Sequence, residues 1–476
     1  MNLLEAYAKR LSISESVYSK QHMGAKMDNY KKLAVAKVLE NTNKFLNEAF
    51  NSTVGTQRSD MGLFKKFCLN LTTVALPNLI AHDLVLVSPM ASMTGYVTYI
   101  EYQYSTTKGD AKAGDAFNTP WKLNNPVESF TSERVVETVE AGNNTITLSW
   151  TPIRTSAFVE RTVDKNGNVN ERVLGDVKIT HRNGTVEYKT LNGATTVTGL
   201  AEGDRVAYVY DNIVVPQNNI PSIKAEMKSI PLLAKARRIA VYYSQIAAFQ
   251  AKTDYGFDLG DQLAEKAVGQ LSYEIDTEIV KFLEEIADKN AADGFELPAW
   301  DRTIPVGVSK SEHYEGFCEI IEIGRQMIYD RTQRFAPNYM VIASNILPIL
   351  TFIKGFQAAP AGQINGPYFA GTLNGLKVYV SPAIEAGKFF LGVNGDDMMS
   401  SVAVYAPYMA VVPTQLLQYA DGGTSQGWST MYDLKALNEN LIIEGHIDGL
   451  AMGTVYGTQA SPVYAVTSAP ATTTAE

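Results

Sequence analysis

Apolar side chains recur at steps of three and four residues along positions 258–290, which places them on one face of a helix. The stripe consists of Leu263, Ala267, Leu271, Ile275, Ile279, Leu283 and Ile286. Asp258 and Asp261 suit the start of a helix, and Asn290 and Gly294 suit its end. The pattern therefore predicts one helix over 258–290, roughly 50 Å long. A long core helix and a strut that stiffens a flattened protein both fit this length.

A second pattern, alternation, predicts strands before this helix. Tyr96, Thr98, Ile100, Tyr102 and Tyr104 alternate with other residues and predict a long strand that ends near Ser105.

Residues 130–215 contain short alternating runs separated by Asn-Gly at 166–167, 183–184 and 192–193. Asn-Gly favours the positive φ values of tight hairpin turns, so about seven short strands and a small β-sandwich-like domain are expected. Both flanks have the pattern of another unit, which makes this block an insertion.

Further along the chain, residues 230–253 have the pattern of a helix with Pro231 in its first turn. An amphipathic helix is predicted over 314–331. Strands are predicted at 339–342, 376–380 and 389–393, with a short helix over 346–354 between the first two. This alternation of strand and helix predicts an α/β domain.

Charge and composition narrow the class of protein. The chain has 476 residues, a net charge of −9 and 45 % hydrophobic residues, which is unlike a dedicated nucleic-acid binder. Residues 1–66 have the opposite sign, with eleven Lys or Arg against six Asp or Glu. They suggest an arm without a core of its own that lies on other surfaces. Its charge fits either an anionic partner or a solvated face.

Two cysteines, Cys68 and Cys318, exclude a disulfide framework and favour a reducing compartment. No signal peptide or membrane-spanning stretch is recognisable in the sequence, so a cytoplasmic protein is expected.

The search for catalytic chemistry gives no candidate. The five histidines are scattered, without the spacing of metal ligands, and no phosphate-binding loop, nucleophile elbow or zinc-protease motif occurs. Glu278, Glu284 and Glu285 on the predicted long helix are interpreted as a solvated edge or as charges that face a partner. We expect no enzyme activity, no cofactor and no metal.

Several blocks, in the same order, resemble the major capsid protein of T-even-like tailed phages. They are ALPNLIAHD at 75–83, AKARR at 234–238 with YGFD at 255–258, LGVNG at 391–395, APY at 406–408 and GWSTMY at 427–432. The resemblance covers about two thirds of the chain and leaves out the first 66 residues and the β-rich insertion.

The resemblance implies an α+β fold of the Hong Kong 97 type, with a long spine helix, an E-loop made of strands near 95–105 and 213–224, a P-domain and an A-domain, and with the β-sandwich-like domain inserted. The implied order is an N-terminal arm (1–74), a first P-domain segment with one E-loop strand (75–129), the β-rich insertion (130–215), the E-loop return with the pre-spine and spine helices of the P-domain (216–310), the A-domain (311–440), a returning P-domain segment (441–465) and a disordered tail (466–476).

The function that the resemblance implies is self-assembly into hexamers and pentamers of an icosahedral tailed-phage head around double-stranded DNA. The spine stripe of Leu263, Leu271, Ile275, Ile279 and Leu283 would support assembly. Glu48 and Glu40, each third in a hydrophobic-any-Glu triplet, resemble maturation cleavage sites.

The expected partners are other copies of the chain, other capsid or decoration proteins, a scaffold, a portal, a prohead protease and, by non-specific contact, packaged DNA; no membrane is expected. The chain would be assembled in the cytoplasm of the bacterial host and would end in the virion capsid. Three alternatives stay open: a vertex subunit that forms only pentamers, an encapsulin-like shell, and an enzyme with an Ig-like accessory domain.

Overall fold

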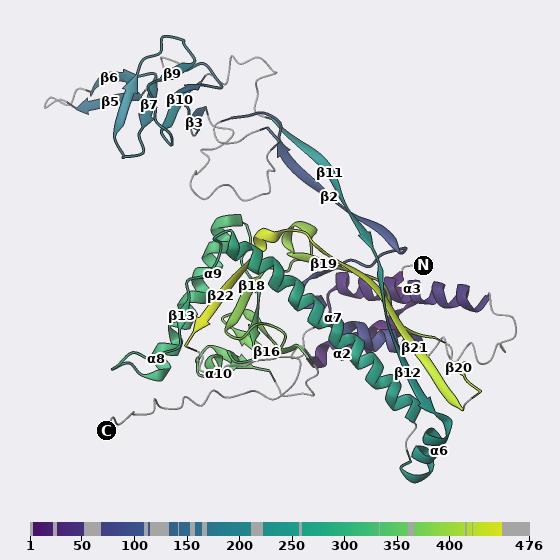
Figure 1. The fold of residues 1–476 in the computed structure, drawn as a ribbon. Coiled ribbons are helices and arrows are strands. Elements are labelled where there is room, and N and C mark those ends of the chain that lie inside the picture. Colours follow the sequence, from purple (N-terminus) through teal and green to yellow (C-terminus); the bar gives the residue numbers. More distant parts are fainter. Residues whose placement is uncertain are drawn as a thin grey trace, which may run out of the picture. The chain divides into compact units, whose positions relative to one another are not determined.

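The computed structural model describes residues 3–21, 26–51, 68–108, 113–114, 133–140, 142–152, 158–163, 169–210, 222–256, 259–332, 334–359, 366–414, 417–420 and 422–449. The chain divides into two compact units (Figure 1). One unit comprises Met1–Val97 and Ile230–Glu476, and the other comprises Thr98–Ser229. The predicted tail, 466–476, lies outside the described residues.

The N-terminal region forms three helices: α1 (Leu3–Ala6), α2 (Ala8–Gln21) and α3 (Asn29–Asn51). They share a small apolar core made of Leu11, Tyr18, Met27, Val35, Ala36, Leu39 and Leu69. The expectation that this region has no core of its own was therefore wrong. Apolar side chains at helical spacing on short helices pack against one another here, and α3 also packs on β19 (Ala403–Pro413).

A sheet built from distant parts of the chain lies beside α3. Its strand order is β1 (Leu86–Val87), β19, β21 (Gly423–Ala436) and β12 (Lys235–Ser244), and β20 (Leu417–Gln418) pairs with β21. Strand β1 runs parallel to β19, whereas β12 and β19 run antiparallel to β21.

The predicted helix over 230–253 was wrong for most of its length. The chain is strand there, and only α6 (Gln245–Asp254) is helical. Strand β12 pairs with β21 from Lys235 opposite Tyr432 to Ser244 opposite Gly423, and its side chains alternate between exposed and half-buried over most of the strand. Pairing with a strand far away in the sequence outweighs a local helical pattern.

The seven-stranded sheet holds most of the apolar core. Its order is β13 (Trp300–Asp301), β22 (Ile442–Asp448), β18 (Lys388–Gly392), β14 (Tyr339–Ala343), β17 (Leu376–Ser381), β16 (Tyr368–Leu373) and β15 (Phe356–Ala358). The helices of this part are α8 (Lys310–Glu315), α9 (Phe317–Thr332) and α10 (Leu347–Leu350). Strands β14, β17 and β18 confirm the three predicted strands, and the predicted helix over 314–331 is divided between α8 and α9.

The predicted long helix is α7 (Leu259–Ala292), which packs on both sheets. It ends before Gly294, whose φ of 82° is in the left-handed region that favours glycine after a helix. The short elements η1 (Leu76–Asn78) and α5 (Ala81–Leu84) precede β1 and belong to the same core.

Strands β2 (Thr94–Tyr104) and β11 (Ile223–Leu233) pair as a two-stranded ribbon (Figure 1). The first strand agrees with the prediction. Most of the predicted return strand, 213–224, lies outside the described residues, and the described strand covers Ile223–Leu233. It extends through Pro231, which a strand with an unpaired edge tolerates.

The insertion consists of short strands around a core of its own. A four-stranded sheet has the order β3 (Arg134–Thr138), β10 (Arg205–Val209), β7 (Val177–Thr180) and β8 (Val186–Lys189). Two further pairs are β4 (Thr145–Thr147) with β9 (Thr196–Thr198), and β5 (Phe158–Val163) with β6 (Val169–Gly175). The sheet and the β4–β9 pair bury Val135, Ile179, Val197, Val206 and Tyr208 between them.

The Asn-Gly turns differ from one another. Both residues of Asn192-Gly193 have positive φ, but this turn joins β8 to β9, which pair with other strands. At Asn183-Gly184, between the paired strands β7 and β8, only the glycine has positive φ. The pair at 166–167 lies outside the described residues. Of these two described Asn-Gly pairs, both lie in turns, but only Asn183-Gly184 joins two strands that pair with each other.

Candidate functional site: the long helix and its polar anchors

The predicted stripe on α7 faces the interior of the protein. Leu271, Ile275, Ile279 and Leu283 are buried, and Leu263 is half-buried. Ile275, Ile279 and Leu283 belong to the core of the seven-stranded sheet, whereas Leu271 packs with Val411 and Trp428 of the β19–β21 sheet. One helix face thus joins the two sheets.

Asp276 is a buried carboxyl group in the middle of this apolar face. Its Oδ1 accepts a hydrogen bond from the backbone N–H of Ile80 at 3.1 Å. Burial raises the pKa of Asp276 well above its usual value, because a charged carboxylate loses its hydration there. Asp276 therefore links α7 to the segment between η1 and α5. The sequence pattern missed this role, since an Asp beside an apolar stripe is normally on the solvent side.

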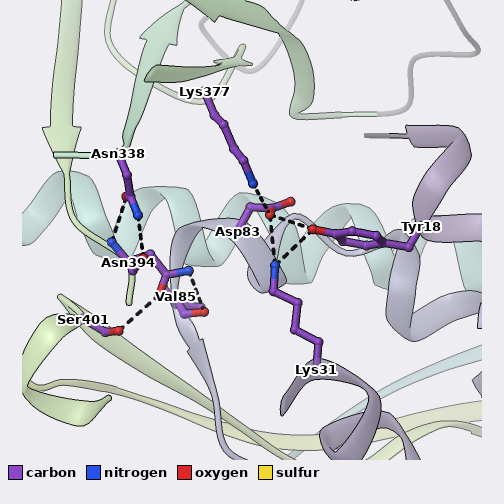
Figure 2. A network of polar contacts seen from close by, with 8 residues as sticks. All are labelled: Tyr18, Lys31, Asp83, Val85, Asn338, Lys377, Asn394 and Ser401. Carbon is purple, nitrogen blue, oxygen red and sulfur yellow. Dashed lines mark hydrogen bonds and ion pairs between the residues drawn. The ribbon is translucent and has the colours of Figure 1, made fainter. Parts of the chain in front are cut away.

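A second buried carboxylate, Asp83 of α5, joins three parts of the chain (Figure 2). Its Oδ1 accepts a hydrogen bond from the Tyr18 hydroxyl at 3.0 Å and pairs with Nζ of Lys31 at 3.2 Å and Nζ of Lys377 at 2.9 Å. Nζ of Lys31 also donates to the Tyr18 hydroxyl at 3.0 Å. Burial and the nearby carboxylate raise the pKa of Tyr18. This Asp83 node holds α2 and α3 to α5 and β17.

Next to the Asp83 node, two asparagines connect the ends of four strands, β1, β14, β18 and β19 (Figure 2). The side chain of Asn338 accepts from the backbone N–H of Asn394 at 2.9 Å and donates to its carbonyl oxygen at 2.6 Å. Oδ1 of Asn394 accepts from the Ser401 hydroxyl at 3.2 Å, and its Nδ2 donates to the carbonyl of Val85 at 3.4 Å. A cavity of about 250 Å³ lies among these groups and the Asp83 node.

Asn41 of α3 makes a third anchor. Its Nδ2 donates to the carbonyl oxygens of Met90, at 2.6 Å, and Tyr408, at 3.1 Å. The preceding residue, Glu40, is half-buried and pairs with Lys44 at 3.0 Å. Glu48 also lies in α3, and its side chain is outside the described part. Both candidate cleavage positions therefore lie within a packed helix.

Two of the three glutamates on the polar face of α7 have partners within the protein, which a solvated edge would not require. Glu278 forms an ion pair with Arg237 of β12 and accepts a hydrogen bond from the Tyr432 hydroxyl, in a groove of about 480 Å³ between α7 and the β12–β21 pair. Burial and this hydrogen bond raise the pKa of Tyr432. Glu284 accepts from the backbone N–H of Glu385 at 3.2 Å. Glu285 is exposed, as the predicted solvated edge requires, and a role of these charges toward a partner stays a prediction.

At the end of α7, the ammonium group of Lys388 forms ion pairs with three carboxylates. Nζ of Lys388 lies 3.0 Å from Asp288, 3.2 Å from Glu385 and 3.3 Å from Glu444. Burial and a hydrogen bond with Asp288 raise the pKa of Glu444 to about 7, against the opposing effect of Lys388.

These polar groups connect elements, and nothing in their geometry prepares a nucleophile or a metal ion. Among the described residues, no three His, Cys, Asp or Glu side chains are grouped to hold a metal, and no helix is long and apolar enough to cross a membrane. The two cysteines are free thiols.

Comparison with known proteins decides the family. Residues 61–451 match the family described as major capsid protein Gp23, which is most of the chain. The chain belongs to the Gp23 major capsid protein family. It is 23 % identical over 393 residues to the major capsid protein of Escherichia phage AR1, covering 76 % of this chain and 73 % of that one. The values for Enterobacteria phage T4 are 23 % over 394 residues, 76 % and 73 %.

Solved structures with partial similarity include phage chains and an encapsulin complex from Synechococcus elongatus. A chain from Microbacterium phage Oxtober96 has a TM-score of 0.33 at 10 % identity and covers 69 % of this chain and 95 % of its own. The capsid of Myoviridae phage XM1 has a TM-score of 0.32 at 8 % identity and covers 49 % and 80 %. Similarity at this level adds nothing to the family assignment.

The predicted family and the α+β fold are thus confirmed. The structure contains a long helix, α7, the β2–β11 ribbon and a separate mixed sheet. The protein is a major capsid protein of a tailed phage, a structural component that self-assembles into the virion shell.

Proposed function

We propose that the chain forms the hexamers and pentamers of an icosahedral head that encloses double-stranded DNA. The observation that carries this proposal is the β2–β11 ribbon. Tyr96, Ile100 and Tyr102 occupy alternate positions of β2 and are exposed, and Tyr96 retains 74 % of its accessible surface. Met227 of β11 is exposed as well. A two-stranded ribbon is marginally stable alone, so these side chains need another surface to cover them.

The stripe residues Leu263, Leu271, Ile275, Ile279 and Leu283 have a supporting role in this proposal. Because the stripe joins two sheets through one helix, it keeps the contact surfaces of the subunit at fixed positions relative to one another within this unit. Assembly into a closed shell needs such a rigid subunit, since each copy meets several neighbours at once.

The partners proposed for the shell are other copies of the chain, other capsid or decoration proteins, a scaffold, a portal and a prohead protease, with assembly in the cytoplasm of the bacterial host. The role is structural, without catalysis. The basic N-terminal region is proposed to face packaged DNA, where cations displace condensed counterions. Part of its charge is already neutralised within the chain, since Lys31 pairs with Asp83 and Lys32 pairs with Glu15 at 3.0 Å.

Maturation cleavage after Glu40 or Glu48 is part of the same proposal. A protease binds an extended segment, so a cut at either position requires α3 to leave β19 first. N-terminal sequencing of mature particles tests it: a new N-terminus at Asn41 or Ala49 supports cleavage, and an intact start contradicts it.

Assembly is tested by sedimentation velocity and negative-stain microscopy of the purified full-length chain, with and without its phage-encoded scaffold. Capsomers, tubes or shells are expected, and subunits at both five-fold and six-fold positions support the hexamer and pentamer roles. Pentamers alone would identify a vertex subunit. Monodisperse monomer at high concentration under both conditions contradicts the proposal. Nuclease protection of DNA in particles purified from infected cells tests enclosure.

A further inference from the structure

The inserted domain contains a histidine whose two ring nitrogens both contact carboxylate oxygens. Nδ1 of His181 lies 2.7 Å from Oδ2 of Asp204, and Nε2 of the same ring lies 3.4 Å from Oε2 of Glu187. His181 follows β7, Glu187 belongs to β8, and Asp204 ends the turn before β10. The three side chains, here called the His181 clamp, therefore join three segments of the domain.

Asp204 forms the buried side of the His181 clamp. Its side chain keeps 2 % of its surface exposed, whereas those of His181 and Glu187 keep 25 % and 48 %. The Asp204 carboxylate also accepts hydrogen bonds from the backbone N–H groups of Arg182, at 3.1 Å, and Ala201, at 2.9 Å. Hydrogen bonds from N–H groups stabilise the ionised form of a carboxylate, so the proton between Asp204 and His181 belongs to the ring.

The charged form of the ring is the one that fits both contacts of His181. A neutral imidazole carries one N–H, so its other nitrogen would turn a lone pair toward a carboxylate oxygen. The imidazolium donates at both nitrogens and places a positive charge between two negative ones. The hydrogen bond with Asp204 raises the pKa of His181 above its ordinary value, against the opposing effect of burial, and the contact with Glu187 raises it further.

The other charged side chains around the His181 clamp come from the same three segments. They are Arg182, Lys189, Glu202 and Arg205. Nζ of Lys189 lies 3.7 Å from Oε1 of Glu187. Arginine, lysine and exposed carboxylates keep their charge between about pH 6 and about pH 9. Within this cluster, the charge that changes in that range is therefore the charge of His181.

We propose that the His181 clamp is a proton-operated lock of the inserted domain, which holds the β7–β8 hairpin to the turn before β10 while the ring is charged. Below the ordinary pKa of histidine, the ring is charged in the folded and in the unfolded chain, and the stabilisation by the clamp is complete. Because the pKa in the folded chain is the higher one, this stabilisation is lost as the pH rises through it. The backbone pairing of β7 with β8 and β10 stays, so the domain loosens at this turn without unfolding.

Hydrogen exchange, measured by mass spectrometry on the unassembled full-length protein at about pH 6 and about pH 9, tests the lock. After correction for the intrinsic effect of pH on exchange, the amides of 181–189 and 200–205 should lose protection by about two- to fivefold at the higher pH, as for one ion pair. His181→Gln should abolish this difference, because an amide side chain does not titrate. His446→Gln is the matched control, since His446 lies in the other unit and pairs with Asp448 at 3.3 Å. It should leave the pH dependence of these amides unchanged.

Titration of the histidine ring signals by nuclear magnetic resonance measures the same proton directly. The signal that disappears in His181→Gln belongs to His181, and its midpoint should lie above the ordinary histidine value. Glu187→Gln keeps the size of the side chain and leaves buried Asp204 in place, so it should lower this midpoint and let the amides lose protection at a lower pH. A His181 midpoint at or below the ordinary value overturns the inference. So does a pH dependence of exchange that is the same in the unchanged protein and in His181→Gln.

Discussion

Asp83→Asn removes the negative charge at the centre of the Asp83 node while it keeps the size of the side chain. The carboxylate is fully buried, whereas its partners Lys31 and Lys377 keep 17 % and 44 % of their side-chain surface exposed. Breaking a buried ion pair typically costs about 3–5 kcal/mol when the remaining charge stays buried. Both ammonium groups can regain part of their hydration, so we expect a cost of about 2–3 kcal/mol in the docking of α2 and α3.

Native-state hydrogen exchange on unassembled protein measures this loss of docking free energy directly in α2 and α3. Amides of α2 and α3 exchange when these helices open from the core, so a cost of about 2–3 kcal/mol accelerates them by about 30- to 150-fold. Lys32→Met is the matched control, because Lys32 is the next residue on α3 and pairs with the half-exposed Glu15. A pair of that kind is worth at most about 1 kcal/mol.

Lys31→Met should lie between these two variants, since Lys377 still neutralises Asp83. Removing both lysines leaves the buried carboxylate without a cation, so their combined effect should exceed the sum of the single effects. If Asp83→Asn and Lys32→Met change the exchange of α2 and α3 equally, the node does not hold the N-terminal helices and the reasoning is refuted.

Three further predictions concern other parts of the chain. Ile275→Asp puts a carboxyl group into the apolar seam of α7 and should cost several kcal/mol in chemical denaturation, whereas exposed Glu285→Ala should change stability by no more than about 0.5 kcal/mol. The pKa of Glu444 in the folded protein, about 7, lies above the ordinary value of a glutamate, so the protonated side chain stabilises the fold at low pH and this stabilisation is lost as the pH rises through 7. Glu444→Gln should weaken this pH dependence of stability, measured as hydrogen exchange of the β22 amides at pH 5 and pH 8. An unchanged pH dependence contradicts the assignment. Residues 130–215 should fold alone, with a β-rich circular dichroism spectrum and a cooperative melt, because they have their own core; a disordered fragment contradicts this.

The sequence predicted α7 well because every determinant of that helix is local. Its stripe, from Leu263 to Ile286, repeats with the helical period over about six turns, and Gly294 follows the end of the helix. The strands β14, β17 and β18 were predictable for a similar reason, since their β-branched and aromatic residues are buried on both faces.

Strand β12 was mispredicted because its local pattern and its tertiary partner disagree. The stretch from Ile230 contains leucine, alanine, lysine and arginine, all good helix formers, and only the later Ile239, Val241 and tyrosines favour a strand. What decides the outcome is β21, almost two hundred residues further along, whose register against β12 is continuous. A single sequence gives no signal of that pairing.

The polar anchors escaped prediction because a buried carboxylate has the same appearance in a sequence as an exposed one. Asp83 sits in the block ALPNLIAHD, and its partners Tyr18, Lys31 and Lys377 are 65, 52 and 294 positions away. Asp276 is adjacent to a stripe residue, and its partner Ile80 is 196 positions away. The sequence offers one clue, because burial of an unpaired carboxylate is unfavourable. An Asp beside an apolar face must therefore be neutral, paired or exposed to solvent, and only the fold shows which of these holds. In this protein both carboxyl groups attach to the segment 80–83, so the same short segment receives α7 from one side and the N-terminal helices from the other. That segment thus adds polar links to the apolar packing of α7 on the two sheets and of α3 on β19.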